Sequence, residues 1–168
     1  MVKKNVLVVV IAVVAVVVAI LIYVYLSRIG TLEYKISKYL RENYSEEGVA
    51  ISLSDFTDFE WEAALVFFPN TTTRDIQDSL GVEYSRSLDL LAGIIFTNDN
   101  EVVYEEMFRE YSHFDNMPPF YISPNPKDPD DSQRAWFKVF TTETAVFQGY
   151  VMNNSEREYY RLYPITAK

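Results

Sequence analysis

Four carboxylates in the stretch SDFTDFEWE could do acid–base chemistry. Asp55, Asp58, Glu60 and Glu62 could supply an acid and a base, as in glycosidases, and Trp61 among them would suit stacking against a sugar. Glu60 and Glu62, however, alternate with apolar residues at the period of a strand, which places both on its solvent face. Because an acid and base pair must lie opposed across a cleft, we interpret these carboxylates as surface groups.

Other catalytic chemistries lack their residue types. The chain has no cysteine, which excludes a thiol nucleophile and a thiolate metal site, and its single histidine, His113, excludes a cluster of histidine ligands. Ser112, His113 and Asp115 have the types of a catalytic triad, but sequence neighbours rarely converge as nucleophile, base and orienting group. We therefore predict that the protein is not an enzyme and binds no cofactor.

The stretch 109–133 is rich in proline and reads as a long surface loop, a kind of segment that is often functional or mobile. Its aspartates Asp128, Asp130 and Asp131 offer the oxygen ligands that calcium prefers. No central glycine or terminal glutamate follows at the spacing of a calcium-binding loop. We interpret them as a solvated charge run and predict no metal site.

The charge of the chain favours a basic partner. It carries 24 acidic and 15 basic residues, a formal charge of −9, and without Lys3 and Lys4 the remainder holds 24 acidic against 13 basic residues, a charge of −11. Such a surface lacks the lysines and arginines that neutralise phosphates, which argues against nucleic acid. No pattern indicates a small-molecule substrate.

The chain is uncharged from Val6 to Leu26. At about 1.5 Å per residue a helix of this length would cross a hydrocarbon core of about 30 Å, so we predict a single-pass contact with the lipid bilayer. A cleaved signal peptide is the alternative, but its apolar region is usually shorter. Lys3 and Lys4 favour a signal anchor in the cell membrane with the domain outside the cytoplasm.

These signals divide the chain into four predicted parts: a cytoplasmic tail at 1–5, a transmembrane anchor at 6–26, a juxtamembrane amphipathic helix at 27–47 and an extracytoplasmic domain at 48–168. The helix is best defined over 31–44, where Leu32, Ile36, Tyr39 and Leu40 recur at helical spacing. It would pack on the domain as a stalk or first helix, or lie on the membrane surface.

The domain is predicted as α+β, a mainly antiparallel β-meander with one or two helices. A second helix at 70–80 has a capping signal in Thr72 and Asp75 and a stop at Gly81. The expected strands are 49–53, 59–68, 90–97, 101–108, 134–141, 144–152 and 157–165. We expect 134–141 and 144–152 to pair as a hairpin and 157–165 to form an edge strand.

The stretch Ser54 to Gly81 carries a resemblance. Its FEW motif, apolar strand, P-x-T motif, short helix and closing LG resemble a family of small bacterial envelope proteins that are lipidated or membrane-anchored. The chain departs from that family at Asn70, where an aromatic is common, and in lacking a lipidated cysteine. The resemblance implies a bacterial origin and an extracytoplasmic address, and it transfers no catalytic residue. The layout is loosely similar to surface-anchored toxin-immunity proteins.

Two functions remain open from the sequence. The first is a membrane-anchored binding protein, an immunity or inhibitor protein, that captures a basic protein partner; the second is an envelope-associated accessory or sensory protein without enzymatic activity. The expected contact residues lie in and beside the long loop: Phe114, Phe120, Tyr121, Asp128, Asp130 and Asp131. The alternative for the aromatic residues is that their rings pin the loop onto the domain.

Overall fold

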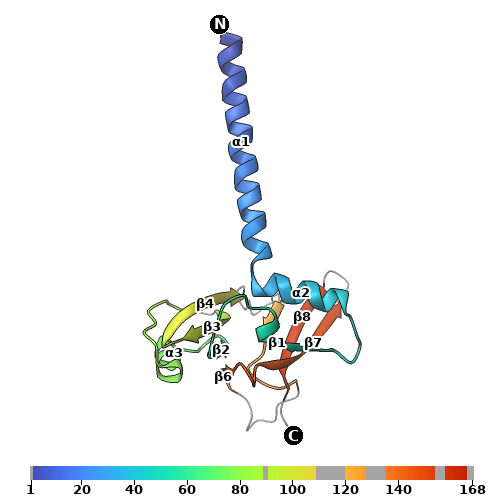
Figure 1. The fold of residues 1–168 in the computed structure, drawn as a ribbon, viewed down its shortest axis with the longest axis vertical. Coiled ribbons are helices and arrows are strands. Elements are labelled where there is room, and N and C mark those ends of the chain that lie inside the picture. The colour runs from blue at the N-terminus through green and yellow to red at the C-terminus, as the bar shows by residue number, and fades with distance from the viewer. Residues whose placement is uncertain (1, 89–90, 109–119, 128–134, 154–157, 166–168) are drawn as a thin grey trace.

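The fold combines three α-helices with two four-stranded sheets over the part of the chain that the structure describes. The structure is a computed structural model and describes residues 2–88, 91–108, 120–127, 135–153 and 158–165 (Figure 1). The elements are α1 (Val2–Ile29), α2 (Leu32–Glu42), β1 (Val49–Ser52), the 3₁₀ turn η1 (Leu53–Asp55), β2 (Ala63–Phe67), α3 (Thr73–Leu80), β3 (Ala92–Asn98), β4 (Glu101–Phe108), β5 (Phe120–Ile122), β6 (Phe137–Thr141), β7 (Val146–Asn153) and β8 (Glu158–Pro164).

The strands form two sheets. Sheet I has the order β1-β7-β8-β5, and its β5–β8 pair is parallel. Sheet II has the order β4-β3-β2-β6 and is antiparallel throughout. In Figure 1 the two sheets lie beside each other, with α2 over sheet I and α3 at the far side of sheet II.

Strand β2 is buried on both faces, and this divides the interior into two apolar clusters. Ala64 and Val66 face the larger cluster, which the two sheets share with α2, whereas Leu65 and Phe67 face a smaller cluster that α3 covers through Ile76. The larger cluster includes Leu32, Ile36, Leu40, Ile51, Phe96, Phe147 and Leu162. Alternate side chains of β2 therefore face two different apolar clusters, and neither face of the strand is exposed to solvent.

The predicted single β-meander is wrong. Strands β6 and β7 belong to different sheets, so the turn between them, closed by the bond from Ala145 N to Thr141 O (2.9 Å), carries the chain from sheet II to sheet I. Strand β8 lies between β7 and β5 and is not an edge strand. Alternation in a sequence shows which side of a strand is apolar, but two packed sheets and one meander produce the same alternation.

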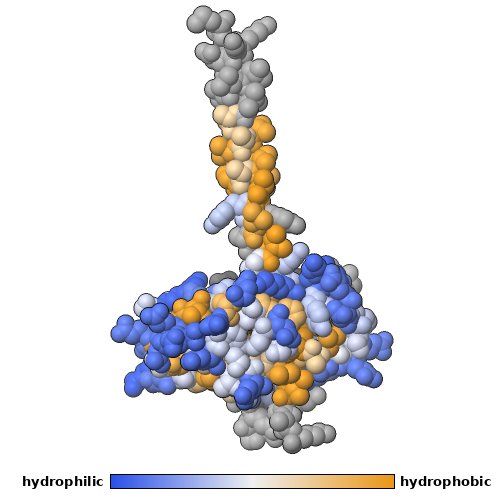
Figure 2. Space-filling view, in the orientation of Figure 1, coloured by the Kyte–Doolittle hydropathy of each residue, from blue (hydrophilic) through white to orange (hydrophobic). Residues whose placement is uncertain are grey.

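The predicted transmembrane anchor at 6–26 is also corrected. Among the residues that the structure describes, no helix is both long enough and apolar enough to cross a membrane. The finding contradicts the single-pass, signal-anchored location at the cell membrane. Figures 1 and 2 show α1 extending from the domain with apolar side chains on its described surface.

Several short-range predictions are confirmed. Thr72 and Asp75 form a reciprocal capping box at the start of α3, and Gly81 follows its end in the left-handed conformation, at φ 69°. The run Asn98-Asp99-Asn100, whose residue types tolerate positive φ, predicts a tight turn between the strands at 90–97 and 101–108; Asp99 and Asn100 have positive φ, 51° and 61°, in the turn between β3 and β4. These features depend only on local backbone chemistry, which a sequence specifies directly.

The two tryptophans provide a matched test of this packing. Trp61 is 6% exposed, packs edge-to-face on Phe96 at 5.0 Å and donates to Thr57 Oγ1, whereas Trp136 is 60% exposed. We expect Trp61→Ala to lower the free energy of unfolding by about 3 to 5 kcal/mol and Trp136→Ala by less than about 1 kcal/mol. Urea denaturation of both variants measures the difference. Equal losses would contradict the placement of Trp61 in the larger cluster.

Candidate functional site

A buried carboxylate fixes the start of α2. Leu32 N and Glu33 N donate to the two oxygens of Glu106 at 2.7 and 2.9 Å, and Tyr104 OH also donates to Glu106. Burial first, and then the bond to Glu106, raise the pKa of Tyr104, so its hydroxyl remains a donor. An anion is favoured at a helix N-terminus, and here it ties α2 to an edge strand of sheet II.

The inner face of α2 is set by close packing. Leu32, Ile36 and Leu40 are buried, and a Cβ on Gly149 would stand 2.6 Å from Leu40 Cδ2. Glycine at this position of β7 therefore lets the helix approach the sheet. The side of α2 that carries Lys35 and Tyr39, at the border of this buried face, faces the segment that follows β1.

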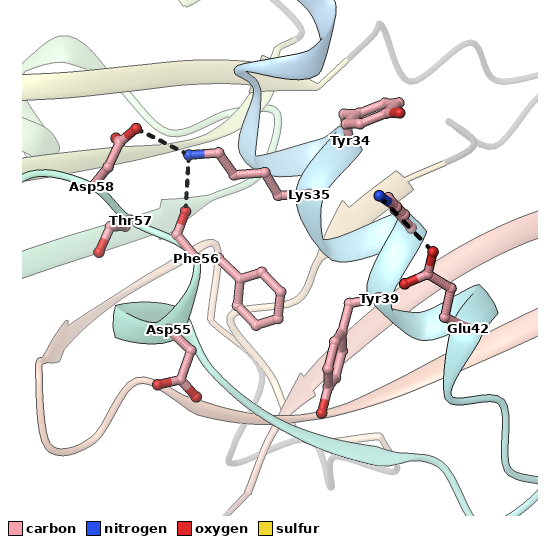
Figure 3. A pocket seen from close by; sticks show the side chains of 9 residues that line it. Tyr34, Lys35, Tyr39, Glu42, Asp55, Phe56, Thr57 and Asp58 are labelled. Carbon is pink, nitrogen blue, oxygen red and sulfur yellow. Dashed lines mark hydrogen bonds and ion pairs between the residues drawn. The ribbon is translucent and has the colours of Figure 1, made fainter.

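A groove of about 440 Å³ lies between α2 and residues 55–58 (Figure 3). It is an open hollow with charged and aromatic walls. Its lining residues are Tyr34, Lys35, Lys38, Tyr39 and Glu42 from α2 and Asp55, Phe56, Thr57 and Asp58 from the facing segment. Its volume falls within the range of about 300 to 1,000 Å³ that is usual for ligand sites.

One wall of the groove is aromatic. The rings of Tyr39 and Phe56 meet edge-to-face at 5.2 Å and 71°, which holds Tyr39 in place between helix and loop. Tyr34 and Tyr39 remain 39% and 37% exposed. Tyrosines that are rigid and partly exposed are suited to contact a partner.

The lysines of the groove already have partners within the protein. Lys35 Nζ lies 3.3 Å from both Phe56 O and Asp58 Oδ2, and Lys38 Nζ lies 3.9 Å from Glu42 Oε1. The exposed Asp55 has no ion-pair or hydrogen-bond partner for its carboxylate among the described residues. The groove therefore has an excess of negative charge at Asp55.

More carboxylates gather at the adjoining end of sheet II. Ala63 stands between Thr97 and Thr141 in the register, so the start of β2, the β3–β4 turn and the turn after β6 meet at one end of the sheet. We call the exposed carboxylates of these segments the acidic rim: Glu60, Glu62, Asp99, Glu101 and Glu143. None of them has an ion-pair partner in the described ranges. The segment 55–60 joins the rim to the groove.

The basic side chains that the structure describes, in contrast, have partners within the protein. Lys127 and Lys138 lie over aromatic rings, and Arg161 is buried between Tyr121 and Tyr159. The remaining basic residues with described side chains form ion pairs: Lys35–Asp58, Lys38–Glu42, Arg41–Glu158, Arg74–Asp78 and Arg86–Glu105. Among the side chains that the structure describes, the charge left without a partner is therefore negative.

The contact residues predicted from the sequence lie apart from the groove or outside the described residues. Phe120 is 1% exposed and packs on Phe108, so it serves the larger cluster. Tyr121 is half-buried, stacks on Phe68 at 5.3 Å and lies against the Arg161 guanidinium. Phe114, Asp128, Asp130 and Asp131 lie outside the described residues, as do Ser112, His113 and Asp115. The described rings thus pack inward, as the alternative interpretation has it.

Sequence reasoning did not find the groove. It placed Tyr39 on the same apolar face as Ile36 and Leu40, and it treated Asp55 and Asp58 as ordinary surface charges. The helical period was a usable signal, because Tyr39 lies next to Leu40 and so at the border of the buried face. The sequence does not indicate that residues 55–58 lie against α2 at the border of its buried face. No group of side chains that could hold a metal ion occurs within the described ranges.

Comparisons with known proteins add no relative. We found no family model, curated protein or solved structure that matches this chain. The resemblance to small envelope proteins and to toxin-immunity proteins therefore stays a prediction.

Replacing Glu106 tests whether its carboxylate holds α2. Glu106→Gln would turn an amide donor toward one of the groups that donate to Glu106, so we expect a loss of about 1 to 3 kcal/mol in the free energy of unfolding. Glu101→Gln, on the same strand but exposed, is the control and should cost less than about 0.5 kcal/mol. Urea denaturation gives both values, and a loss at Glu106 no larger than the control would show that the cap does not hold the helix.

Proposed function

We propose that this protein is a binding module without enzymatic activity and that it captures a basic protein partner through the acidic rim and the groove beside α2. The observation that carries the proposal is the uneven use of charge: the described basic side chains pair with acids or rings of the protein itself, whereas the rim carboxylates and Asp55 do not.

The net charge supports the encounter of such a pair. With −9 on the chain, a positively charged protein is attracted at long range, and the free carboxylates at one end of sheet II give that attraction a direction. Hydrophilic surface covers much of the face shown in Figure 2. Charge of this kind speeds association, but it contributes less to the lifetime of the complex.

The groove supports retention of the partner. Tyrosine is among the residues that most often dominate binding energy, and Tyr34 and Tyr39, which line the groove together with Asp55, are partly exposed. A protein that neutralises a basic toxin or enzyme needs only to occupy its surface and requires no chemistry of its own. An immunity or inhibitor role is the biological setting that this argument favours.

The test is to capture partners with the full chain, identify them and measure association rates with the purified partner. We expect a basic partner whose association rate falls about tenfold or more between about 0.05 and about 0.5 M salt, because screening removes long-range attraction. A variant with Glu60, Glu62 and Glu143 changed to glutamine should associate more slowly at low salt than one with Glu46, Asp78 and Glu83 neutralised.

The control variant loses the same number of charges, so the comparison separates the rim from net charge. Glu46, Asp78 and Glu83 are exposed and lie outside the rim. An acidic partner, or an association rate that is the same at both salt concentrations, would contradict the proposal.

A further inference from the structure

The groove beside α2 presents a tyrosine ring and a carboxylate without a cation between them. Figure 3 shows Tyr39 and Asp55 on either side of the Phe56 ring, each from a different element. The two lysines that line the groove are drawn toward Asp58 and Glu42 and do not neutralise Asp55. A ligand that completes this arrangement must therefore bring its own positive charge.

The same protein shows how such a set is completed elsewhere. Arg41 lies with its guanidinium carbon 5.9 Å from the centre of the Tyr160 ring, donates to Tyr160 OH at 2.7 Å and pairs with Glu158 at 2.9 Å. The bond from Tyr160 first, and then Arg41, lower the pKa of Glu158, so the carboxylate stays ionised. In this unit the guanidinium meets the carboxylate and the hydroxyl of the tyrosine. Arg161, whose guanidinium carbon lies 5.0 Å from the centre of the Tyr121 ring, shows a guanidinium held over a tyrosine ring in the same protein.

An anion fits the groove poorly. Glu42, Asp55 and Asp58 among the lining residues outnumber Lys35 and Lys38, and each lysine would have to leave its present partner to bind an anion. These exposed ion pairs are individually weak, so it is the net negative charge of the lining that opposes an anion. The charge of the lining therefore selects a cation.

Arginine fits better than lysine. A guanidinium is planar, so it can lie on an aromatic ring and at the same time form two parallel hydrogen bonds with one carboxylate. An ammonium is a compact, strongly hydrated charge and gains less from the ring. The open shape of the groove suits a side chain that projects from the surface of another protein.

We propose that this groove receives an arginine side chain of the partner, with the Tyr39 ring as its stacking surface and the Asp55 carboxylate as its counter-ion. The inference rests on the proposed function and gives the partner a recognition feature, an exposed arginine.

The test uses the full chain with two labelled peptides of equal length and charge, an oligoarginine and an oligolysine, each acetylated and amidated at its ends. Fluorescence anisotropy at constant salt measures the dissociation constants. We expect the arginine peptide to bind more tightly, and Asp55→Asn and Tyr39→Leu each to weaken it by about fivefold or more. Tyr39→Phe keeps the ring and should bind like the unmodified protein.

Asp78→Asn is the matched control, since it removes one exposed carboxylate on α3 and should change binding by less than about twofold. Circular dichroism of Tyr39→Leu checks that the fold is kept; if it is not, Asp55→Asn and the comparison of the two peptides still decide the proposal. Equal effects of Asp55→Asn and Asp78→Asn, or equal affinity for the two peptides, would overturn the arginine site. The proposed function would survive that result, because its own test depends on the salt response of the captured partner and on the rim variant.

Discussion

The apolar cluster shared by α2 and the two sheets is the constraint on which the rest of the structure depends. Leu32, Ile36 and Leu40 enter this cluster from over sheet I, and Gly149 allows the helix to come close to the sheet. Once α2 is held there, its remaining side must face the segment after β1, and the groove is the space between them. The candidate site is thus a consequence of how the core closes.

Glu106 adds direction to this packing. Apolar contacts alone would tolerate a helix that slides along the cluster, whereas bonds from Leu32 N and Glu33 N to one carboxylate set where α2 begins. A charged group buried in this way is retained when its oxygens are satisfied, and here Tyr104 supplies a further donor. The bond also links α2 to sheet II, so the groove and the acidic rim belong to one body.

The distribution of charge follows from the same fold. Basic side chains with long stems lie over aromatic rings or reach carboxylates, which satisfies them without a partner. The ends of β2, β3 and β6 meet at one end of sheet II and bring the carboxylates of the acidic rim together. These carboxylates have no ion-pair partner among the described residues. A composition that is only moderately acidic therefore becomes a strongly negative edge.

The sequence by itself determined the local features: the capping box of α3, the positive φ at Asp99 and Asn100 and the amphipathic α2. Each depends on residues a few positions apart. Tertiary structure alone decided that β6 and β7 join different sheets, that Phe120 serves the core and that 55–58 faces α2. These are contacts between distant segments, and many pairings of the same apolar faces satisfy the same alternation, so only the packed chain selects among them.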